Sequence, residues 1–316
     1  MDANLTCQGV PPTGNQKMRT ETGTSRAAIA KLARLLVLAA WACVLPLGAA
    51  QAEQARLDSR FFTSSDGVHL HYLIGGEGPT LVFVPGWTMP ASIWERQLRH
   101  FSANHRVVAL DPRSQGRSEI APAGHNPKRR SQDIKELLDT IGGEPVLLVG
   151  WSLGVLETLS YVKFHGDDRL RGLVLVDNSI GEDPPPTPSG FLKRLRKNRT
   201  KAMDGFVRSM FKTHQDEAFL KDLVQVTLRI PLDKSIRLFS TLYPRNVWRE
   251  TVYATKVPLM YIVTPRLQEQ GGNLKRKRPT AWVEIFTESG HALFVDEEDR
   301  FNNLLQRFIT QRVWPN

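Results

Sequence analysis

Short apolar runs recur along the chain from about residue 60, and polar or glycine-rich segments separate them. Most of these runs are apolar at every position, which is typical of strands that are buried on both faces of a parallel sheet. We expect such strands at residues 81–84, 107–110, 145–149, 173–176, 259–263 and 282–286. Two other runs, 61–63 and 69–73, flank an Asp66-Gly67 turn and predict a pair of strands at the start of the sheet.

Segments with helical periodicity lie between or after these strands. Their apolar side chains recur three or four positions apart, so each predicted helix has one apolar face. These side chains are Ile134, Leu137, Leu138 and Ile141, then Val155, Leu156, Leu159 and Val162, and finally Phe301, Leu304, Leu305, Phe308 and Ile309. Alternating strands and helices predict an α/β fold with a mostly parallel, doubly wound sheet of about eight strands. Such sheets carry their chemistry at the carboxyl ends of the strands.

The strand pattern stops between residues 181 and 256. A proline-rich segment, 184–188, leads there into amphipathic helical segments. We therefore predict a helical lid inserted after the sixth strand, between a first part of the core at 53–180 and a second part at 257–316. We expect the basic run 193–201 to be the solvated face of this lid. Attraction to an anionic membrane or polymer surface is the alternative.

Composition places the chain among ordinary globular proteins, with 316 residues, 41% hydrophobic and 23% charged. The formal net charge of +10 raises the question of a nucleic-acid partner. Much of the basic excess lies in residues 1–52 and in two clusters, 193–201 and 275–278, rather than in a stripe. We therefore expect no nucleic-acid partner.

Residues 1–52 have the features of a secretory signal peptide. Three basic residues, Arg26, Lys31 and Arg34, precede an apolar stretch at 35–50, and Ala50-Gln51-Ala52 forms an A-x-A cleavage signal. The apolar stretch is short for a membrane-spanning helix. We expect an exported protein, periplasmic or secreted, without a stable membrane span after cleavage. An uncleaved N-terminal anchor is the alternative.

Met18 is an alternative start of this segment, because residues 1–17 add no recognisable basic region. Both cysteines, Cys7 and Cys43, lie in the same segment, so the mature chain would contain none. An exported domain without thiols has no disulfide framework and is stabilised by its core.

The stretch Gly150-Trp151-Ser152-Leu153-Gly154 carries the most informative pattern. A predicted strand precedes it and a predicted helix follows it, which is the context of a nucleophile elbow. A sharp strand-to-helix turn leaves no room for side chains two positions either side of its apex, so glycine fits there. Ser152 would then lie exposed at the sheet edge, next to backbone N–H groups that can hold an anion.

Four motifs now stand in order: Pro85-Gly86-Trp87, the Asp111–Ser118 loop, Gly150–Gly154 and Gly290-His291. With them, the chain from about Arg60 to Val313 resembles an α/β-hydrolase of the serine esterase and cofactor-free haloperoxidase type. The resemblance implies that Ser152 is the nucleophile and His291 the general base. It also implies that Asp111 and Arg113 brace a loop, and that the enzyme needs no cofactor and no metal.

A carboxylate that orients the histidine completes the catalytic triad of these hydrolases, and this sequence offers two candidates for it. Related hydrolases usually carry it after the strand at 259–263, but the turn here, 264–269, contains no aspartate. Some relatives place the acid one strand earlier, which corresponds to Asp177. We expect Asp177 to be the acid, with Glu269 as the alternative. In either case the order serine, acid, histidine is kept.

The resemblance also implies an oxyanion hole made of two backbone N–H groups, those of Trp87 and Leu153. Pro85-Gly86 stands where relatives often have His-Gly. We expect the side chains of Trp87 and Trp151 to line the substrate pocket, with a place in the core as the alternative.

His69 and His71 alternate on one predicted strand and have no third metal ligand nearby, so we expect both to be exposed strand residues. The predicted function is therefore that of an exported serine hydrolase that cleaves small carboxylic esters through an acyl-enzyme. A lactone or amide hydrolase, a cofactor-free perhydrolase and an inactive binding protein of the same fold are the alternatives. A serine at the elbow argues against haloalkane or epoxide opening, which in relatives uses a carboxylate nucleophile.

Overall fold

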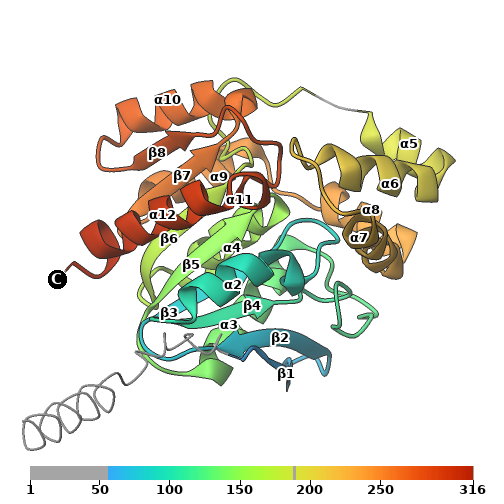
Figure 1. The fold of residues 1–316 in the computed structure, drawn as a ribbon, viewed down its shortest axis with the longest axis horizontal. Coiled ribbons are helices and arrows are strands. Elements are labelled where there is room, and N and C mark those ends of the chain that lie inside the picture. Colours follow the sequence, from blue (N-terminus) through green and yellow to red (C-terminus); the bar gives the residue numbers. More distant parts are fainter. Residues whose placement is uncertain (1–55, 188–189, 316) are drawn as a thin grey trace, which may run out of the picture. The chain divides into compact units, whose positions relative to one another are not determined.

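A computed structural model describes residues 56–187 and 190–315. Its sheet has eight strands in the order β1-β2-β4-β3-β5-β6-β7-β8 (Figure 1). The strands are β1 Asp58–Thr63, β2 His69–Gly75, β3 Thr80–Val84, β4 Arg106–Leu110, β5 Val146–Trp151, β6 Leu170–Val176, β7 Leu259–Val263 and β8 Trp282–Ile285. β2 pairs antiparallel with β1 and β4, and every other pairing is parallel. The predicted α/β class is confirmed.

The expected signal peptide, residues 1–52 with Met18 and both cysteines, lies outside the described residues. Among the described residues, no helix combines the length and the apolar character that crossing a membrane requires.

The central strands are buried on both faces, which explains their continuous apolar runs. In β3, Val82 and Val84 belong to one apolar core, while Leu81 and Phe83 belong to the other. Successive side chains of a strand point to opposite faces, so one strand supplies both cores. The sheet is thus the middle layer of three, with helices on each side.

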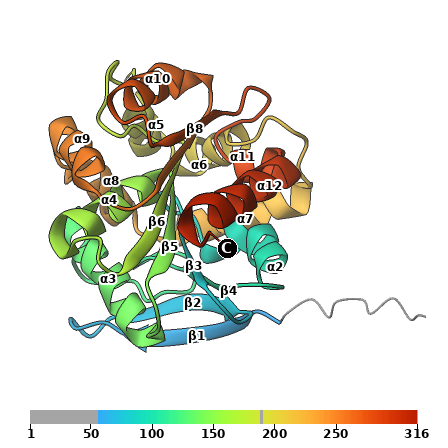
Figure 2. The same cartoon turned by 90° about the vertical axis from the view of Figure 1, so that its left-hand side faces the viewer.

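Helices outside the insertion cover the two faces of the sheet (Figure 2). They are η1 Ala91–Trp94, α2 Glu95–Phe101, α3 Pro127–Ile141, α4 Leu153–His165, η2 Pro265–Leu267, α10 Gln268–Lys277, α11 Leu293–Asp296, α12 Glu298–Phe308 and η3 Ile309–Val313. α3 and α4 lie on one face, and α2 and α12 lie on the other. The start of α3 shows how sequence sets these helices: the Asn126 side chain accepts the N–H of Arg129, and Pro127 occupies the first turn.

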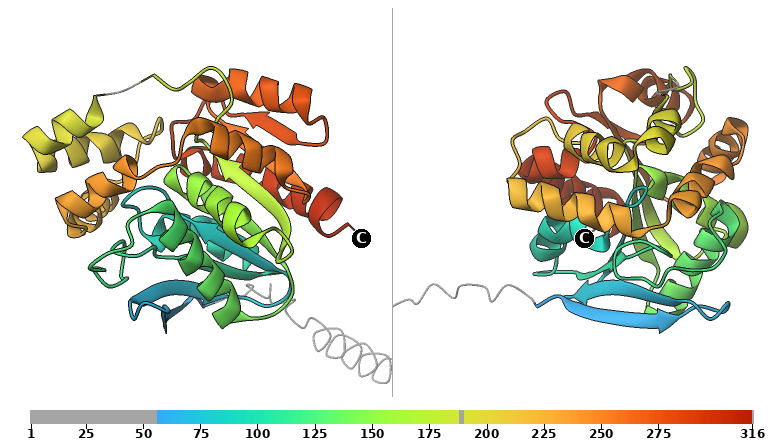
Figure 3. Two further views of the ribbon diagram at one scale, coloured as in Figure 1. Left: turned by 180° about the vertical axis from the view of Figure 1, so that it is seen from behind. Right: turned by 90° about the vertical axis from the view of Figure 1, so that its right-hand side faces the viewer.

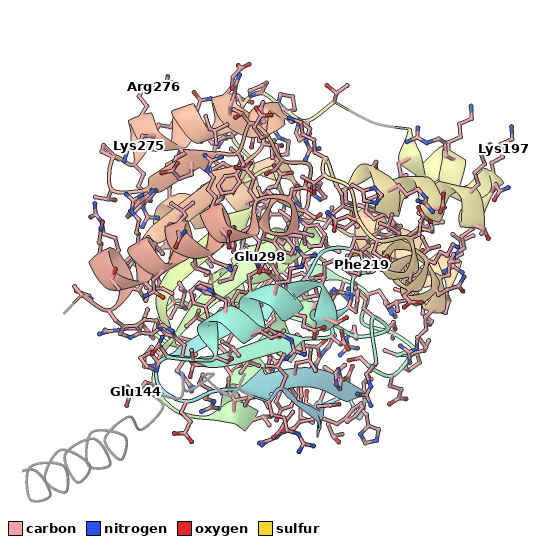
Figure 4. The ribbon with its side chains drawn as sticks, viewed as in Figure 1. Glu144, Lys197, Phe219, Lys275, Arg276 and Glu298 are labelled. Carbon is pink, nitrogen blue, oxygen red and sulfur yellow. The ribbon has the colours of Figure 1, made fainter. Side chains whose placement is uncertain are left out.

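The described residues between β6 and β7, where the sequence predicted a helical insertion, form five helices: α5 Phe191–Lys197, α6 Arg199–Ser209, α7 Glu217–Arg229, α8 Leu232–Ser240 and α9 Arg245–Ala254. Figure 3 shows α5 to α8 gathered on one side of the sheet. Lys197, in the basic run, lies at the outer end of this group and is exposed (Figure 4). We refer to residues 181–256 as the helical insertion.

Candidate active site

Ser152 lies at the apex of a tight turn between β5 and α4. Its φ of 54° is in the left-handed region, which few residues other than glycine adopt. A Cβ at Gly154 would lie 2.4 Å from the carbonyl oxygen of Val84, and one at Gly150 would lie 2.4 Å from the carbonyl oxygen of Gly154. Glycine is therefore required on both sides of the serine. The local geometry is that of a nucleophile elbow.

Three side chains form a hydrogen-bonded chain at the carboxyl edge of the sheet. His291 Nε2 lies 2.8 Å from Ser152 Oγ, and His291 Nδ1 lies 2.6 Å from Asp177 Oδ2. Ser152 follows β5, Asp177 follows β6 and His291 follows β8. These parallel strands end at the same edge, so residues 139 positions apart in sequence meet there. With Nδ1 protonated, Nε2 can accept the serine proton.

Asp177 is the carboxylate that faces the histidine. It is buried, and its Oδ1 accepts the backbone N–H and the hydroxyl of Thr264 at 2.9 and 2.8 Å. Burial opposes the charged form, but hydrogen bonds from His291 and Thr264 outweigh it and hold the pKa of Asp177 below its ordinary value. Glu269, the alternative acid, lies exposed in the first turn of α10. The turn after β7 instead places Arg266 Nη2 3.7 Å from Asp177 Oδ2.

The loop after β3 packs directly against the elbow. A Cβ at Gly86 would lie 2.9 Å from the Cβ of Ser152, so the Trp87 backbone is adjacent to the serine. Within residues 56–187 and 190–315, the N–H groups of Trp87 and Leu153 have no backbone acceptor. Two unpaired donors beside a serine can hold a developing oxyanion. This arrangement fits the expected pair of donors.

The Trp87 side chain joins this loop to the helical insertion. Its Nε1 donates to the carbonyl oxygen of Ser235 in α8 at 2.8 Å. Its ring centroid lies 4.9 to 5.4 Å from the rings of Phe191, Phe206 and Phe239. An apolar aromatic cluster therefore lies next to the expected oxyanion donor.

Trp151 occupies the core, in contrast to the expected place in a pocket wall. It is 0% exposed and packs against Phe294 and Trp94, with ring centroids 5.0 and 6.5 Å apart. Its Nε1 donates to the carbonyl oxygen of His291 at 2.8 Å. The side chain preceding the serine thus supports residues 286–292, the loop between β8 and α11 that carries His291. We refer to it as the histidine loop.

Asp296 joins the histidine loop to the helical insertion. Its Oδ2 accepts the N–H of Gly290 at 2.7 Å and that of Lys212 at 2.8 Å. Its Oδ1 accepts the N–H and the hydroxyl of Thr213 at 3.0 and 2.5 Å. One carboxylate therefore fixes the residue before His291 and a segment of the insertion together.

A second serine–histidine–aspartate chain joins β1, β2 and the loop after β4, at the other end of the sheet from β8. Ser59 Oγ lies 2.8 Å from His71 Nε2, and His71 Nδ1 lies 2.7 Å from Asp111 Oδ2. The expectation that His71 is exposed was wrong: it is 1% exposed, and Asp111, in the loop after β4, pairs with it. Asp111 also accepts the N–H groups of Ala91 and Arg117, so it braces two loops. We interpret this chain as structural.

Three residues that hold the site together were not predicted from the sequence. Asn178 Nδ2 donates to the carbonyl oxygen of Ser152 at 2.8 Å. Asp296 lies five positions after the histidine and belongs to no motif. Gln115 contacts the loop after β3, and the signal that could have found it is its place in the loop after a buried strand.

The fold and this edge together define an α/β-hydrolase. The chain belongs to the alpha/beta hydrolase family, whose model matches residues 81–304. A pimeloyl-[acyl-carrier protein] methyl ester esterase of Vibrio atlanticus is 27% identical over 264 residues, which cover 76% of this chain and 97% of the esterase. A non-heme chloroperoxidase of Kitasatospora aureofaciens is 35% identical over 115 residues, which cover 36% of this chain and 42% of that protein.

Among solved structures, an esterase from Exiguobacterium antarcticum has a TM-score of 0.73 at 20% identity, covering 80% of this chain and 100% of that chain. At this identity the likeness shows the fold. The chain is therefore an enzyme of the α/β-hydrolase type, with a serine, a histidine and an aspartate hydrogen-bonded at the edge where this fold carries its chemistry.

Proposed function

We propose that this protein is an exported serine hydrolase that cleaves carboxylic esters through an acyl-enzyme on Ser152. The observation that carries the proposal is the chain of hydrogen bonds from Ser152 Oγ through His291 to Asp177. A serine hydroxyl is a weak nucleophile until a positioned base accepts its proton. The buried carboxylate keeps the imidazole in the tautomer that can do so.

The reaction begins when Ser152 Oγ attacks the ester carbonyl carbon and His291 Nε2 takes the hydroxyl proton. The carbonyl oxygen becomes negatively charged, and the N–H groups of Trp87 and Leu153 stabilise it. Asp177 stabilises the imidazolium that forms. When the ester C–O bond breaks, His291 returns the proton to the leaving oxygen and the alcohol departs.

Water completes the cycle. It attacks the acyl carbon while His291 Nε2 takes one of its protons, and the second tetrahedral intermediate collapses as that proton passes to Ser152 Oγ. The carboxylic acid is released and the free enzyme is restored. The same groups serve both halves of the reaction, so no additional catalytic residue is needed.

The aromatic cluster around Trp87 supports an apolar ester as substrate. Phe191, Phe206 and Phe239 pack on the residue whose N–H is the proposed oxyanion donor, so an apolar group of the substrate would meet rings rather than charges. Burial of apolar substrate surface favours binding by about 25 cal/mol per Å². A small ester with an apolar acyl or alkyl group therefore suits this aromatic cluster best.

Perhydrolysis is the second candidate function. The similarity to a non-heme chloroperoxidase supports it, as does a 30% identity over 119 residues to a bifunctional esterase/perhydrolase of Acinetobacter calcoaceticus. In that reaction hydrogen peroxide replaces water at the acyl carbon and the product is a peracid. Peracid formation from an ester and hydrogen peroxide, absent in Ser152→Ala, would distinguish the two functions.

Export forms part of the proposal and is supported by the basic, apolar and A-x-A segments of residues 1–52. Cleavage after Ala52 would leave a mature chain that begins at Glu53. N-terminal sequencing of the protein from the medium or the periplasm tests this. A chain retained in the membrane with residues 1–52 attached would contradict it.

A fluorophosphonate probe tests the nucleophile. The folded protein should gain one probe mass on the peptide that contains Ser152, and Ser152→Ala should remain unlabelled. Activated esters should be hydrolysed by the wild type and left intact by Ser152→Ala and His291→Ala. Ester turnover that persists in both variants would contradict the proposal.

A further inference from the structure

Gln115 holds the loop that carries the proposed oxyanion donor. It lies in the loop after β4, is 1% exposed, and its Nε2 donates to the carbonyl oxygens of Gly86 at 3.0 Å and Met89 at 2.9 Å. Gly86 immediately precedes Trp87 and Met89 follows two positions later. One buried amide therefore fixes both sides of the segment that bears the Trp87 N–H. Pro85 has no N–H of its own to donate.

Arg130 fixes the direction of the Gln115 amide. Arg130 Nη2 donates to Gln115 Oε1 at 3.1 Å. A glutamine amide has one accepting end and one donating end. A rotated amide would face a guanidinium with its donors and two carbonyl oxygens with its acceptor, so only the observed orientation satisfies all three contacts.

Glu157 continues the chain to the helix that starts at the elbow. Arg130 Nε lies 2.5 Å from Glu157 Oε1, and the two side chains are 2% and 4% exposed. Glu157 lies in α4 one turn after Leu153, and both residues line a small cavity together with Arg130. Arg130 lies in α3 and Glu157 in α4, so this buried contact joins the two helices. A buried charge that loses its partner is strongly destabilising.

We propose that Gln115 is a positioning residue for the oxyanion site. Through Arg130 and Glu157 it connects the backbone segment of Trp87 with the helix of Leu153, and so sets the separation of the two N–H donors. This inference rests on the proposed function, because an oxyanion forms only if Ser152 attacks a carbonyl. Gln115 itself touches neither the substrate nor the reacting atoms.

The separation of the donors matters because each must lie about 2.7–3.1 Å from the oxyanion, not from the ground-state carbonyl oxygen. Misplacement of a catalytic group by about 1 Å can lower the rate about 100-fold. A loosened loop should therefore weaken the transition state more than substrate binding. This signature separates a positioning role from a contribution to stability alone.

Gln115→Leu is the test variant, because leucine has a similar size and cannot donate to the two carbonyl oxygens. Gln97→Leu is the matched control. Gln97 is 0% exposed in α2, and its Nε2 also donates twice, to the Phe294 carbonyl oxygen at 2.9 Å and to Asn302 Oδ1 at 3.2 Å. Gln97→Leu loses two buried hydrogen bonds and Gln115→Leu loses three, the third being the one from Arg130, but only Gln115→Leu releases the loop after β3.

The readout compares an ester with a trifluoromethyl ketone that carries the same acyl group. The ketone forms a hemiketal oxyanion with Ser152, so its affinity reports the oxyanion site. We expect Gln115→Leu to lose about 10- to 100-fold in kcat and in ketone affinity, with KM changed less than about threefold. We expect Gln97→Leu to keep both within about threefold of the wild type.

A loss of ketone affinity in Gln115→Leu that exceeds the loss in Gln97→Leu by about fivefold or more supports the inference, and any smaller difference overturns it. If Gln115→Leu does not fold, Gln115→Glu replaces it with the same criterion, because its carboxylate pairs with Arg130 and cannot donate to Gly86. A wild type without ester turnover and without ketone binding would instead overturn the proposed function.

Discussion

Asp177→Asn is the variant that most directly examines the proposed triad acid. Oδ1 of Asp177 accepts two hydrogen bonds from Thr264, while Oδ2 faces His291 Nδ1. Asparagine can keep the two bonds to Thr264 only if its NH₂ group faces the imidazole. The imidazole must then accept with Nδ1 and carry its hydrogen on Nε2, which points that hydrogen at Ser152 Oγ. In this tautomer it cannot take the serine proton.

The opposite rotamer does not rescue the variant. With its oxygen toward His291, the asparagine would face Thr264 with its own NH₂ group; the Thr264 hydroxyl can turn to accept, but the backbone N–H of Thr264 loses its acceptor. Each buried donor left without an acceptor costs about 1–3 kcal/mol, so this rotamer is disfavoured. The wrong tautomer therefore dominates, and removal of the triad carboxylate is expected to lower kcat about 10⁴-fold, or about 5.4 kcal/mol in activation free energy.

The assay is steady-state hydrolysis of an activated ester at neutral pH, with the unfolding free energy of each variant measured in parallel. Asp177→Asn should retain its fold and a KM within about threefold of the wild type. Glu269→Gln, which alters the alternative acid, should keep kcat within about threefold because Glu269 lies exposed on α10. A loss below tenfold in Asp177→Asn, or a comparable loss in Glu269→Gln, would refute the assignment.

Three further predictions concern the scaffold of the site. Asp296→Ala should lower kcat about tenfold and the free energy of unfolding by about 1–3 kcal/mol, because four hydrogen bonds are lost. Asp299→Ala is the exposed control and should change neither kcat nor the free energy of unfolding. Gly154→Ala should destabilise the protein by about 1–3 kcal/mol in a denaturant titration and abolish turnover, because its Cβ would lie 2.4 Å from the Val84 carbonyl oxygen; wild-type stability would contradict this. Burial, followed by nearby cations, lowers the pKa of His125 from 6.5 to about 4. Between these pH values only the unfolded chain binds a proton on His125, so the free energy of unfolding falls as pH drops from 6.5 toward 4, by about 1.4 kcal/mol per pH unit. The free energy of unfolding of His125→Gln should fall less steeply over this range. A pH profile identical to that of the wild type would contradict the assignment of this low pKa to His125.

The fold followed from the sequence because each signal was local and physically unambiguous. Strands such as β3 and β7 are buried on both faces, so their apolar runs are continuous and their boundaries clear. The glycines at 150 and 154 are imposed by backbone atoms 2.4 Å from their would-be Cβ atoms, so this local constraint is visible in the sequence itself.

Other features depended on contacts between distant segments and could not be predicted. His71 was misjudged because strand alternation gives the face of a residue, but not whether another loop covers that face. The core position of Trp151 depends on the packing of α11 and α12, which the pattern of one strand does not contain. Gln115 and Asp296 each act on backbone groups of another loop, and backbone acceptors and donors leave no trace in the residue types they belong to.

The central claim is that the acyl group of the substrate is carried by one serine hydroxyl during turnover. The most direct measurement is a rapid acid quench of the enzyme with excess p-nitrophenyl acetate, followed by mass analysis of the protein and its peptides. We expect an early release of nitrophenolate approaching one equivalent per enzyme, and a single acetyl group on Ser152. Steady turnover with no acetylated enzyme at any quench time, or with the acetyl group on another residue, would contradict it.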